Sequence, residues 1–304
     1  MSSGAKQVTL YGVESTPGTI ATNWKTLAFT SNSLDATAQT TESGSIKDSR
    51  IASGTLVTGI EAKGDIETEF AYGIQDDLLE AVAFNAWSNN VLTFGGTTRK
   101  TLSVIRGFKD IGNYQVFTGC HLNQWSLSIP ESGIVTSKFS IMGMKRTAYQ
   151  AMPTGVVTAA VDAIQFTSLS AGDILIDDQV KPGMCATQLE LTIDNSMQVQ
   201  KCLNYENNIS AVLESVLKGT GNITIAWSSN TAELYEKQFL NETIGLQYSL
   251  KDSDGNKYTL LLPKLQLTAP LPSGSATDVL QTQFSFSIAD TAPTLTRIPV
   301  VVGP

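Results

Sequence analysis

Histidine and cysteine are scarce in this sequence. Its 304 residues include one histidine, His121, and three cysteines, Cys120, Cys185 and Cys202. An odd number of cysteines without a close pair predicts neither a disulfide framework nor a zinc knuckle. His121 directly follows Cys120, and neighbouring residues of a strand point to opposite faces, so we expect a packed or surface histidine instead of a Cys–His dyad. No metal and no cofactor is expected.

Charge is also scarce. Charged residues make up 16% of the chain, the formal net charge is −8, and no basic run is longer than the segment at residues 144–146. Binding to phosphates requires clustered Lys and Arg, so the composition argues against a protein that grips nucleic acid. Hydrophobic residues reach 41%, which is enough for a core. The surface therefore depends on Ser, Thr, Asn, Gln and Gly, which suits a protein packed against neighbours.

Catalytic motifs are missing as well. The sequence has no Gly-Lys phosphate loop, no nucleophile elbow and no metal-binding cluster, so we do not expect an enzyme. The segment DSDGN at residues 252–256 resembles the start of a calcium loop, but no glutamate follows at the required position and strand-like residues flank it. We interpret it as a hairpin turn.

Long apolar runs are absent too. No stretch approaches the length needed to span a bilayer, and the N-terminal residues lack the apolar segment of a signal peptide. We therefore expect no membrane association and assembly in a reduced cytosol.

What the sequence does contain is an internal repeat. Residues 64–70 (GDIETEF) lead into a helical pattern at 76–82, and residues 221–227 (GNITIAW) lead into a second one at 232–239. The strand starts are offset by 157 positions and the helix starts by 156. Residues 120–141 align without gaps on 265–286 at an offset of 145, so the second repeat has lost residues in between. A weaker match aligns 33–38 with 188–193. The order of these matches predicts a duplicated strand-and-helix domain.

The predicted organisation has five parts. They are an N-terminal arm (1–30), a first domain (31–147), a linker (148–183), a second domain (184–290) and an extended C-terminal tail (291–304). Within the first domain, residues 76–87 predict a helix, and residues 91–94 and 99–105 predict a hairpin joined by two glycines. The Ser- and Thr-rich stretch at about 35–55 is a disordered loop, a solvated hairpin tip or a segment ordered by a partner, with its length favouring the last.

The fold class is mainly β with one short helix per repeat. Asp65, Glu67 and Glu69 alternate with Ile66 and Thr68. Because side chains alternate along a strand, the three carboxylates are predicted to share one face.

Taken together, these motifs resemble the tail tube proteins of long, non-contractile-tailed bacteriophages, also called major tail proteins. The first half carries most of the resemblance, and the second half follows it in order but more loosely. The segments are ESTPGT (14–19), GDI (64–66), YGIQDDLLEA (72–81), TRK (98–100), GFKDIGNYQVF (107–117), GC (119–120), SLSI (126–129), GIVT (133–136) and FSIMG (139–143).

The resemblance implies two tail-tube β-sandwich or half-barrel domains whose strands close a β-barrel channel on oligomerisation. Six-domain rings would then need three chains, giving a trimer with pseudo-sixfold symmetry, with a hexamer of chains as the second possibility. The function implied is a structural virion protein of the tail, assembled in the host cytoplasm, whose stacked rings deliver double-stranded DNA to the host.

The resemblance also implies roles for residues and partners. Asp65, Glu67 and Glu69 are the first candidates to face the lumen, where an acidic wall would not retain DNA. The arm and the Ser- and Thr-rich loop would bridge adjacent rings, and the candidate contacts there are Thr16, Pro17, Lys47, Asp48 and Arg50. The implied protein partners are the tape measure protein, the tail terminator and the distal tail protein.

Two alternatives remain open. A carbohydrate- or cell-binding β-sandwich module also suits duplicated β domains, although its usual cluster of aromatic residues is not evident, because the four tryptophans are scattered along the chain. The chain could also be an end piece of a tail, a terminator or distal protein, instead of the repeating tube.

Overall fold

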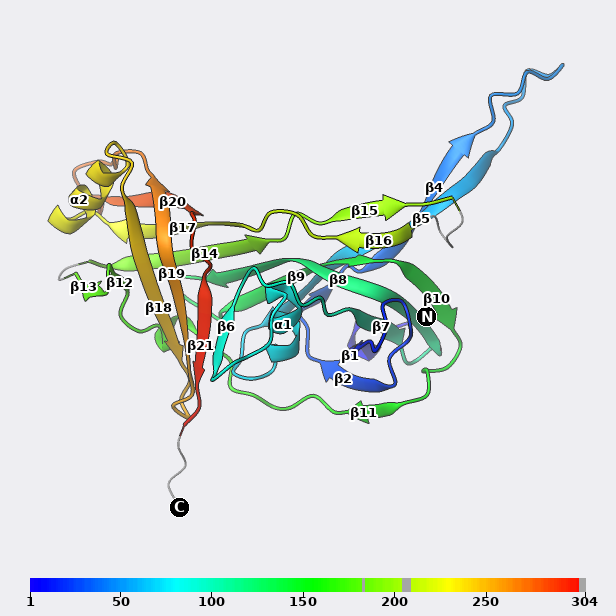
Figure 1. Cartoon of the computed structure of the whole chain (residues 1–304), viewed down its shortest axis with the longest axis horizontal. Coiled ribbons are helices and arrows are strands. Elements are labelled where there is room, and N and C mark those ends of the chain that lie inside the picture. The colour runs from blue at the N-terminus through cyan, green and yellow to red at the C-terminus, as the bar shows by residue number, and fades with distance from the viewer. Residues whose placement is uncertain (182–183, 204–208, 301–304) are drawn as a thin grey trace.

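Two blocks of four antiparallel strands lie side by side and form one continuous eight-stranded sheet (Figure 1). The structure, a computed structural model, describes residues 1–181, 184–203 and 209–300. The first block has the order β4–β5–β9–β8 and the second has the order β14–β17–β20–β19, and β8 pairs with β14 to join them. The bounds are β4 (Asp35–Glu42), β5 (Thr55–Glu69), β9 (Thr136–Gly143), β8 (Asn113–Ile129), β14 (Ala186–Asp194), β17 (Lys218–Ala226), β20 (Gln281–Ile288) and β19 (Lys257–Thr268).

The other strands flank these blocks. β7 and β10 pair with β8, β1 pairs with β7 and β2, and β11 runs parallel to β2. β18 pairs with β19 and β12, and β21 lies between β19 and β6. The bounds are β1 (Gln7–Val13), β2 (Asn23–Leu27), β3 (Ser31–Asn32), β6 (Val91–Thr93), β7 (Leu102–Phe108), β10 (Lys145–Tyr149), β11 (Val156–Thr158), β12 (Leu175–Ile176), β13 (Gln179–Val180), β15 (Gln198–Lys201), β16 (Ile209–Leu213), β18 (Thr243–Lys251) and β21 (Thr294–Ile298).

Strict alternation of polar and apolar residues gives the central sheet one buried face. In β20, the buried Phe284 and Phe286 alternate with the exposed Gln283 and Ser285. Such a pattern places one side of each strand on a core and the other toward water.

Each block has one helix packed near it. α1 (Asp76–Ala83) begins with two carboxylates, which favour the helix dipole, and buries Leu78, Leu79 and Val82. It ends at Phe84, whose φ of 53° is left-handed, so the helix is shorter than the predicted 76–87. α2 (Ser229–Lys237) is capped by Ser228, whose hydroxyl accepts a hydrogen bond from the Thr231 backbone N–H at 3.3 Å.

The buried core is continuous beneath both blocks, and aromatic rings join its parts. Phe70 and Trp125 come from the first block, Tyr258 from the second, and Phe166 from the segment between them. The ring centre of Phe70 lies 5.4 Å from that of Tyr258 and 5.6 Å from that of Phe166. The segment between the blocks is therefore part of the core, because Phe166 is fully buried.

Several sequence predictions differ from this structure. β6 does not form a hairpin with β7; it pairs with β21 near the C-terminus, and β7 pairs with β1 and β8. The first 30 residues include β1 and β2, which bury Leu10 and Trp24 against the first block, so most of the segment is not a free arm. Residues 291–304 are extended as expected as far as described, but β21 is tied into the sheet.

Candidate functional site

The acidic residues predicted to share a face do so. Asp65, Glu67 and Glu69 alternate along β5 with Ile66 and Thr68, which are 3% and 0% exposed on the opposite, core-facing side. Asp65 Oδ1 accepts a hydrogen bond from the Ser140 hydroxyl at 2.6 Å on the adjacent strand β9. The carboxylates therefore stand on the polar face of the sheet.

This polar face continues from strand to strand, because directly paired residues share a face. Glu67 pairs with Lys138, Lys138 with Ser126, and Ser126 with Thr192, so one row crosses from β5 to β14. A shallow groove of about 340 Å³ runs between these strands. In the second block this face continues with Lys218, which pairs with Asp194, and with uncharged side chains, namely Thr220, Asn222, Thr224, Gln283, Ser285, Ser287 and Thr268.

Two acidic residues of this face were missed by the sequence reasoning. Glu190 pairs with Ser128, and Asp194 pairs with Gln124, at the junction of the two blocks. Their signal was present, since Glu190 and Thr192 alternate with apolar residues in the same way as the acids of β5.

The eight-stranded sheet has an unpaired edge at each end. Within the described residues, β4 pairs with β5 alone, and the end of β19 at Leu267 and Thr268 pairs with β20 alone. Side chains occupy backbone donors along these edges. Asp35 Oδ1 accepts from the Ala36 N–H at 2.8 Å, and Gln238 Oε1 accepts from the Ala269 N–H at 3.1 Å. Open edges of this kind are templates for pairing with another chain.

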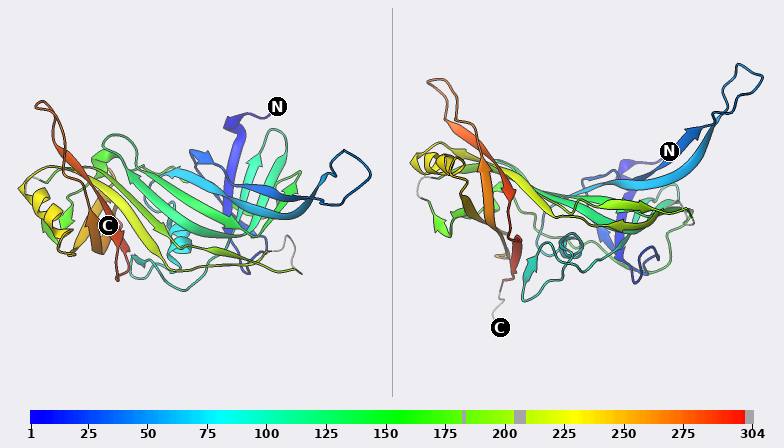
Figure 2. Two further views of the ribbon diagram at one scale, coloured as in Figure 1. Left: turned by 90° about the horizontal axis from the view of Figure 1, so that it is seen from above. Right: turned by 45° about the horizontal axis from the view of Figure 1, so that its top comes forward.

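Two hairpins extend beyond the blocks on the same side as the open β4 edge (Figures 1 and 2). The β4–β5 hairpin projects from the body, and its tip carries the exposed Lys47, Asp48 and Arg50. The β15–β16 hairpin continues β14 and β17, and it packs against the first block through Met197 and Val212.

The other predicted contacts lie elsewhere. Thr16 and Pro17 are exposed in the turn between β1 and β2, where the Thr19 N–H donates to the Thr16 carbonyl at 3.0 Å. They therefore belong to a different element from Lys47, Asp48 and Arg50. The predictions about inter-ring contact concern two separate exposed loops.

A network of polar and aromatic groups fastens the two blocks to each other. Asp76, at the start of α1, accepts hydrogen bonds from the Tyr258 hydroxyl of β19 and from Arg297 of β21. The Arg297 guanidinium lies 4.7 Å from the ring centre of Trp87, a cation–π distance. We call these four residues the inter-block lock.

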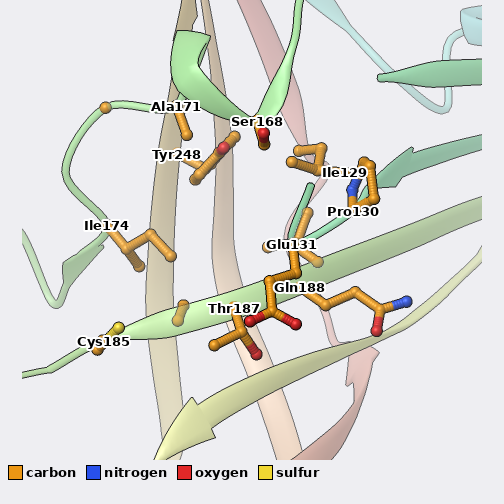
Figure 3. Close-up of a pocket in the computed structure, with 13 residues that line it drawn as sticks. Ile129, Pro130, Glu131, Ser168, Ala171, Ile174, Cys185, Thr187, Gln188 and Tyr248 are labelled. Carbon is orange, nitrogen blue, oxygen red and sulfur yellow. The ribbon is translucent and has the colours of Figure 1, made fainter. Parts of the chain in front are cut away.

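A pocket of about 290 Å³ also lies between the blocks (Figure 3). It is lined by the end of β8, the start of β14 and Tyr248, and Cys185 and Gln188 border it. Burial raises the pKa of Tyr248 to about 12, so this phenol stays protonated at neutral pH.

Cys120 and His121 are both buried side chains. Burial and the nearby Glu14 hold the pKa of the Cys120 thiol well above its usual value, so no thiolate is available there at neutral pH. Burial lowers the pKa of His121, whose Nδ1 lies 2.9 Å from the Gly119 carbonyl oxygen. His121 is thus a packed histidine, as the sequence indicated.

The turn at residues 252–256 was predicted as a hairpin turn, and this is confirmed. It joins β18 to β19, and Asp252 Oδ1 accepts from the Asn256 N–H at 2.8 Å. Across the described ranges, no group of three or more His, Cys, Asp or Glu side chains is arranged to hold a metal ion. In that same part of the chain, no helix has the length and apolar character needed to cross a membrane.

Sequence comparison supplies the family. The family model described as phage tail tube protein matches residues 4–288. The chain belongs to the phage tail tube protein family. No individual curated protein matches it in sequence. The match covers both blocks, both helices and the segment between them, and ends before β21. A tail tube protein is a structural component of the virion tail and assembles with itself.

Membership in the tail tube family gives the surfaces described above a context. A tube wall needs side-by-side contacts, contacts along the tube and an inner face. Open strand edges, exposed loops and a polar sheet face are all present in the described chain.

Proposed function

We propose that three of these chains close a ring, that the rings stack into the tail tube, and that the polar face of the sheet lines the channel for DNA. The observation that carries this proposal is the pair of equivalent blocks with an open edge at each end. A junction between blocks already exists within the chain, where β8 pairs with β14. Repeating that junction between chains would place six blocks in a closed circle.

The equivalence of the blocks supports a duplication. Gly64 of β5 lies against Leu34, and an added Cβ would come within 2.5 Å of the Leu34 Cα. Gly221 of β17 pairs with Leu191, and an added Cβ would meet the neighbouring backbone at 2.1 Å. Both glycines thus permit the same close approach of strands. The loss predicted in the second repeat falls between α2 and β18, where no strand corresponds to β6.

The junction inside the chain also predicts the register between chains. Gln124 and Thr268 occupy equivalent places, because they pair with Ser140 and Ser285 of the equivalent strands β9 and β20. Three residues on, Leu271 then corresponds to Leu127, which pairs with Leu191 inside the chain. Leu34 corresponds to Leu191 by strand pairing, because Leu34 lies against Gly64 and Leu191 pairs with the equivalent Gly221. The expected contact therefore brings Leu271 of one chain opposite Leu34 of the next.

Two prolines in this segment are compatible with pairing. The Pro270 carbonyl accepts a hydrogen bond from the Thr282 hydroxyl at 2.7 Å, so position 270 faces β20 and position 272 does the same by alternation. The missing proline N–H groups are therefore on the covered side. The outer edge carries the N–H groups of Ala269, which Gln238 occupies in the isolated chain, and of Leu271, which is 61% exposed.

The polar face suits a channel for DNA. Asp65, Glu67 and Glu69 would face the lumen, joined by Glu190 and Asp194, with Lys138 as the nearest basic group. Lys63 on β5 and Lys218, which pairs with Asp194, also stand on this face, so carboxylates are in excess over lysines and repel phosphates. DNA would therefore pass without being retained. The exposed loops with Thr16, Pro17, Lys47, Asp48 and Arg50 would contact adjacent rings.

Electron cryo-microscopy of concentrated protein tests this proposal. We expect hollow tubes with three chains in each ring; six whole chains in a ring would retain the tube function but reject the stoichiometry. A chain that stays monomeric at every concentration and salt would contradict the proposal. Copy number in the virion separates a repeating tube subunit from a terminator or distal protein, because only the former is present in many rings.

A further inference from the structure

The β15–β16 hairpin shows how one block can be covered by a hairpin from the next. Met197 and Val212 of this hairpin are buried with Phe84, which follows α1 directly. Beside them, the Asn195 amide donates to the Val82 carbonyl at 3.0 Å, and Arg99 binds Glu214 through two hydrogen bonds of 2.7 and 2.9 Å. The hairpin of the second block thus seals the end of the first block's helix.

The β4–β5 hairpin occupies the equivalent place on the first block. The outer halves of β4 and β5 extend beyond the first block in the same way that β15 and β16 extend beyond β14 and β17. Val57 of β5 pairs with Thr40 of β4. Thr40 lies on the same face of β4 as Ala36, and Ala36 pairs with the buried Ala62. This is the core-side face, yet Val57 is 63% exposed.

The second block has an uncovered helix end of matching character. Phe239 and Leu240 follow α2 as Phe84 follows α1, but they are 65% and 66% exposed, whereas Phe84 is 3% exposed. Two adjacent exposed hydrophobic residues at the position that a hairpin covers in the first block constitute an unfilled docking surface.

We infer that the stem of the β4–β5 hairpin of one chain packs through Val57 and Thr40 onto Phe239 and Leu240 of the neighbouring chain in the same ring. This inference rests on the proposed ring and assigns one of its contacts. The hairpin and α2 lie at opposite ends of the molecule (Figures 1 and 2), so head-to-tail neighbours in a ring bring them together.

Continuity with the open strand edge favours this neighbour over a chain in the next ring. Gln238, the residue before Phe239, is hydrogen-bonded to the Ala269 N–H of the edge that would receive β4. If β4 of the neighbouring chain pairs with the edge at Ala269, its β4–β5 hairpin must therefore run past the end of α2. The hairpin tip at residues 43–54 lies beyond this contact and remains available for an adjacent ring.

Paired cysteines test the contact in assembled protein. Val57→Cys and Phe239→Cys are combined in a chain whose exposed and half-buried cysteines are replaced by Cys185→Ser and Cys202→Ser. After mild oxidation of assembled tubes, we expect a ladder on a non-reducing gel that ends at the number of chains in one ring, which is three under the proposed function. A matched control, Gln198→Cys with Leu213→Cys, joins residues that pair directly across β15 and β16, so it should cross-link within one chain and leave the band monomeric.

Three results would overturn the inference. The first is a ladder that continues past the number of chains in one ring, which indicates contact between rings. The second is the absence of cross-links between chains under conditions in which the control variant is oxidised. The third applies if the first variant does not assemble, and it is the absence of cross-links in assembled Val57→Cys with Leu240→Cys. Absence of tubes or rings from the unmodified chain would instead reject the proposed function, so the two failures are distinguishable.

Discussion

At the residue scale, the groups with unusual environments in this protein serve packing. His121 is 5% exposed, and burial lowers its pKa, while Cys120 beside it is fully buried. Asp76 is enclosed by Tyr258 and Arg297 between the two blocks. Titration and substitution of these groups should therefore change stability and not a chemical activity.

His121 should make the stability of the unassembled chain depend on pH. A histidine whose pKa is lowered on folding binds fewer protons in the native state than in the unfolded state, so the free energy of unfolding falls as pH drops below about 6.5. For one proton, the slope does not exceed about 1.4 kcal/mol per pH unit. Urea unfolding between pH 7.5 and 5 should show a shallower loss for His121→Gln than for the unmodified chain. Parallel curves for the two proteins would contradict the assignment.

The inter-block lock should contribute measurably to stability. The side chains of Arg297 and Asp76 are 31% and 15% exposed, so Arg297→Met removes a partly buried ion pair and the contact with Trp87. We expect a loss of about 1–3 kcal/mol in the free energy of unfolding, measured by urea titration.

The matched control for the lock is Lys25→Met. Its pair with Asp77 has side-chain exposures of 54% and 29%, and more exposed pairs contribute at most about 1 kcal/mol. Equal effects of the two substitutions would show that the lock has no special role.

At the scale of elements, alternation allowed much of the sheet to be predicted. The strands of the repeat, both helix positions and the shared face of Asp65, Glu67 and Glu69 follow from local patterns of period 2 or 3.6. The pairing of β6 with β21 could not be foreseen, because the two strands are about 200 residues apart and nothing local distinguishes that partner from β7. The early end of α1 depends on Phe84 turning left-handed and becoming buried, which is a tertiary effect.

Some features of the candidate site follow from local sequence pattern, and others depend on contacts between distant segments. The shared face of the acidic residues on β5 was predictable from alternation. The open edges at β4 and Leu267 were not, because they depend on which distant strands pair with each other. The first 30 residues were expected to form an arm, but β1 and β2 belong to the fold, because Trp24 and Leu10 are buried against Ile105 of β7.

The tip of the β4–β5 hairpin should be required for stacking but not for folding. Residues 44–52 are exposed, Ser53 is half-buried, and all of them lie outside the paired strands. Replacing them with Asn-Gly, a favourable two-residue hairpin turn, should leave the thermal unfolding midpoint nearly unchanged. Electron microscopy should then show single rings or short stacks instead of long tubes. As a control for loop shortening, Lys47→Ala with Arg50→Ala should weaken stacking less; full-length tubes from the shortened hairpin would contradict the assigned contact.

At the scale of the whole molecule, the proposed ring contains two kinds of junction. The one inside the chain combines the β8–β14 pairing with β21 lying on β6 and with the inter-block lock. The one between chains lacks the last two contacts. β10 pairs with β8 as β21 pairs with β19, but no second-block strand corresponds to β6 in the described chain, and Tyr149 pairs with Tyr114 where Arg297 pairs with Tyr258. The junctions between chains should therefore be the weaker ones.

This asymmetry predicts a two-stage response to urea. Rings should first separate into folded chains, because the junction between chains has fewer contacts, and the chains should unfold afterwards. Separation depends on protein concentration, whereas unfolding of a single chain does not. Light scattering should report the first midpoint and circular dichroism the second, at two concentrations differing tenfold. Arg297→Met should lower the second midpoint more than the first, since the lock lies within the chain. A single transition that shifts with concentration in both signals would mean that the two kinds of junction have similar strength, and that folding of each chain depends on its neighbours.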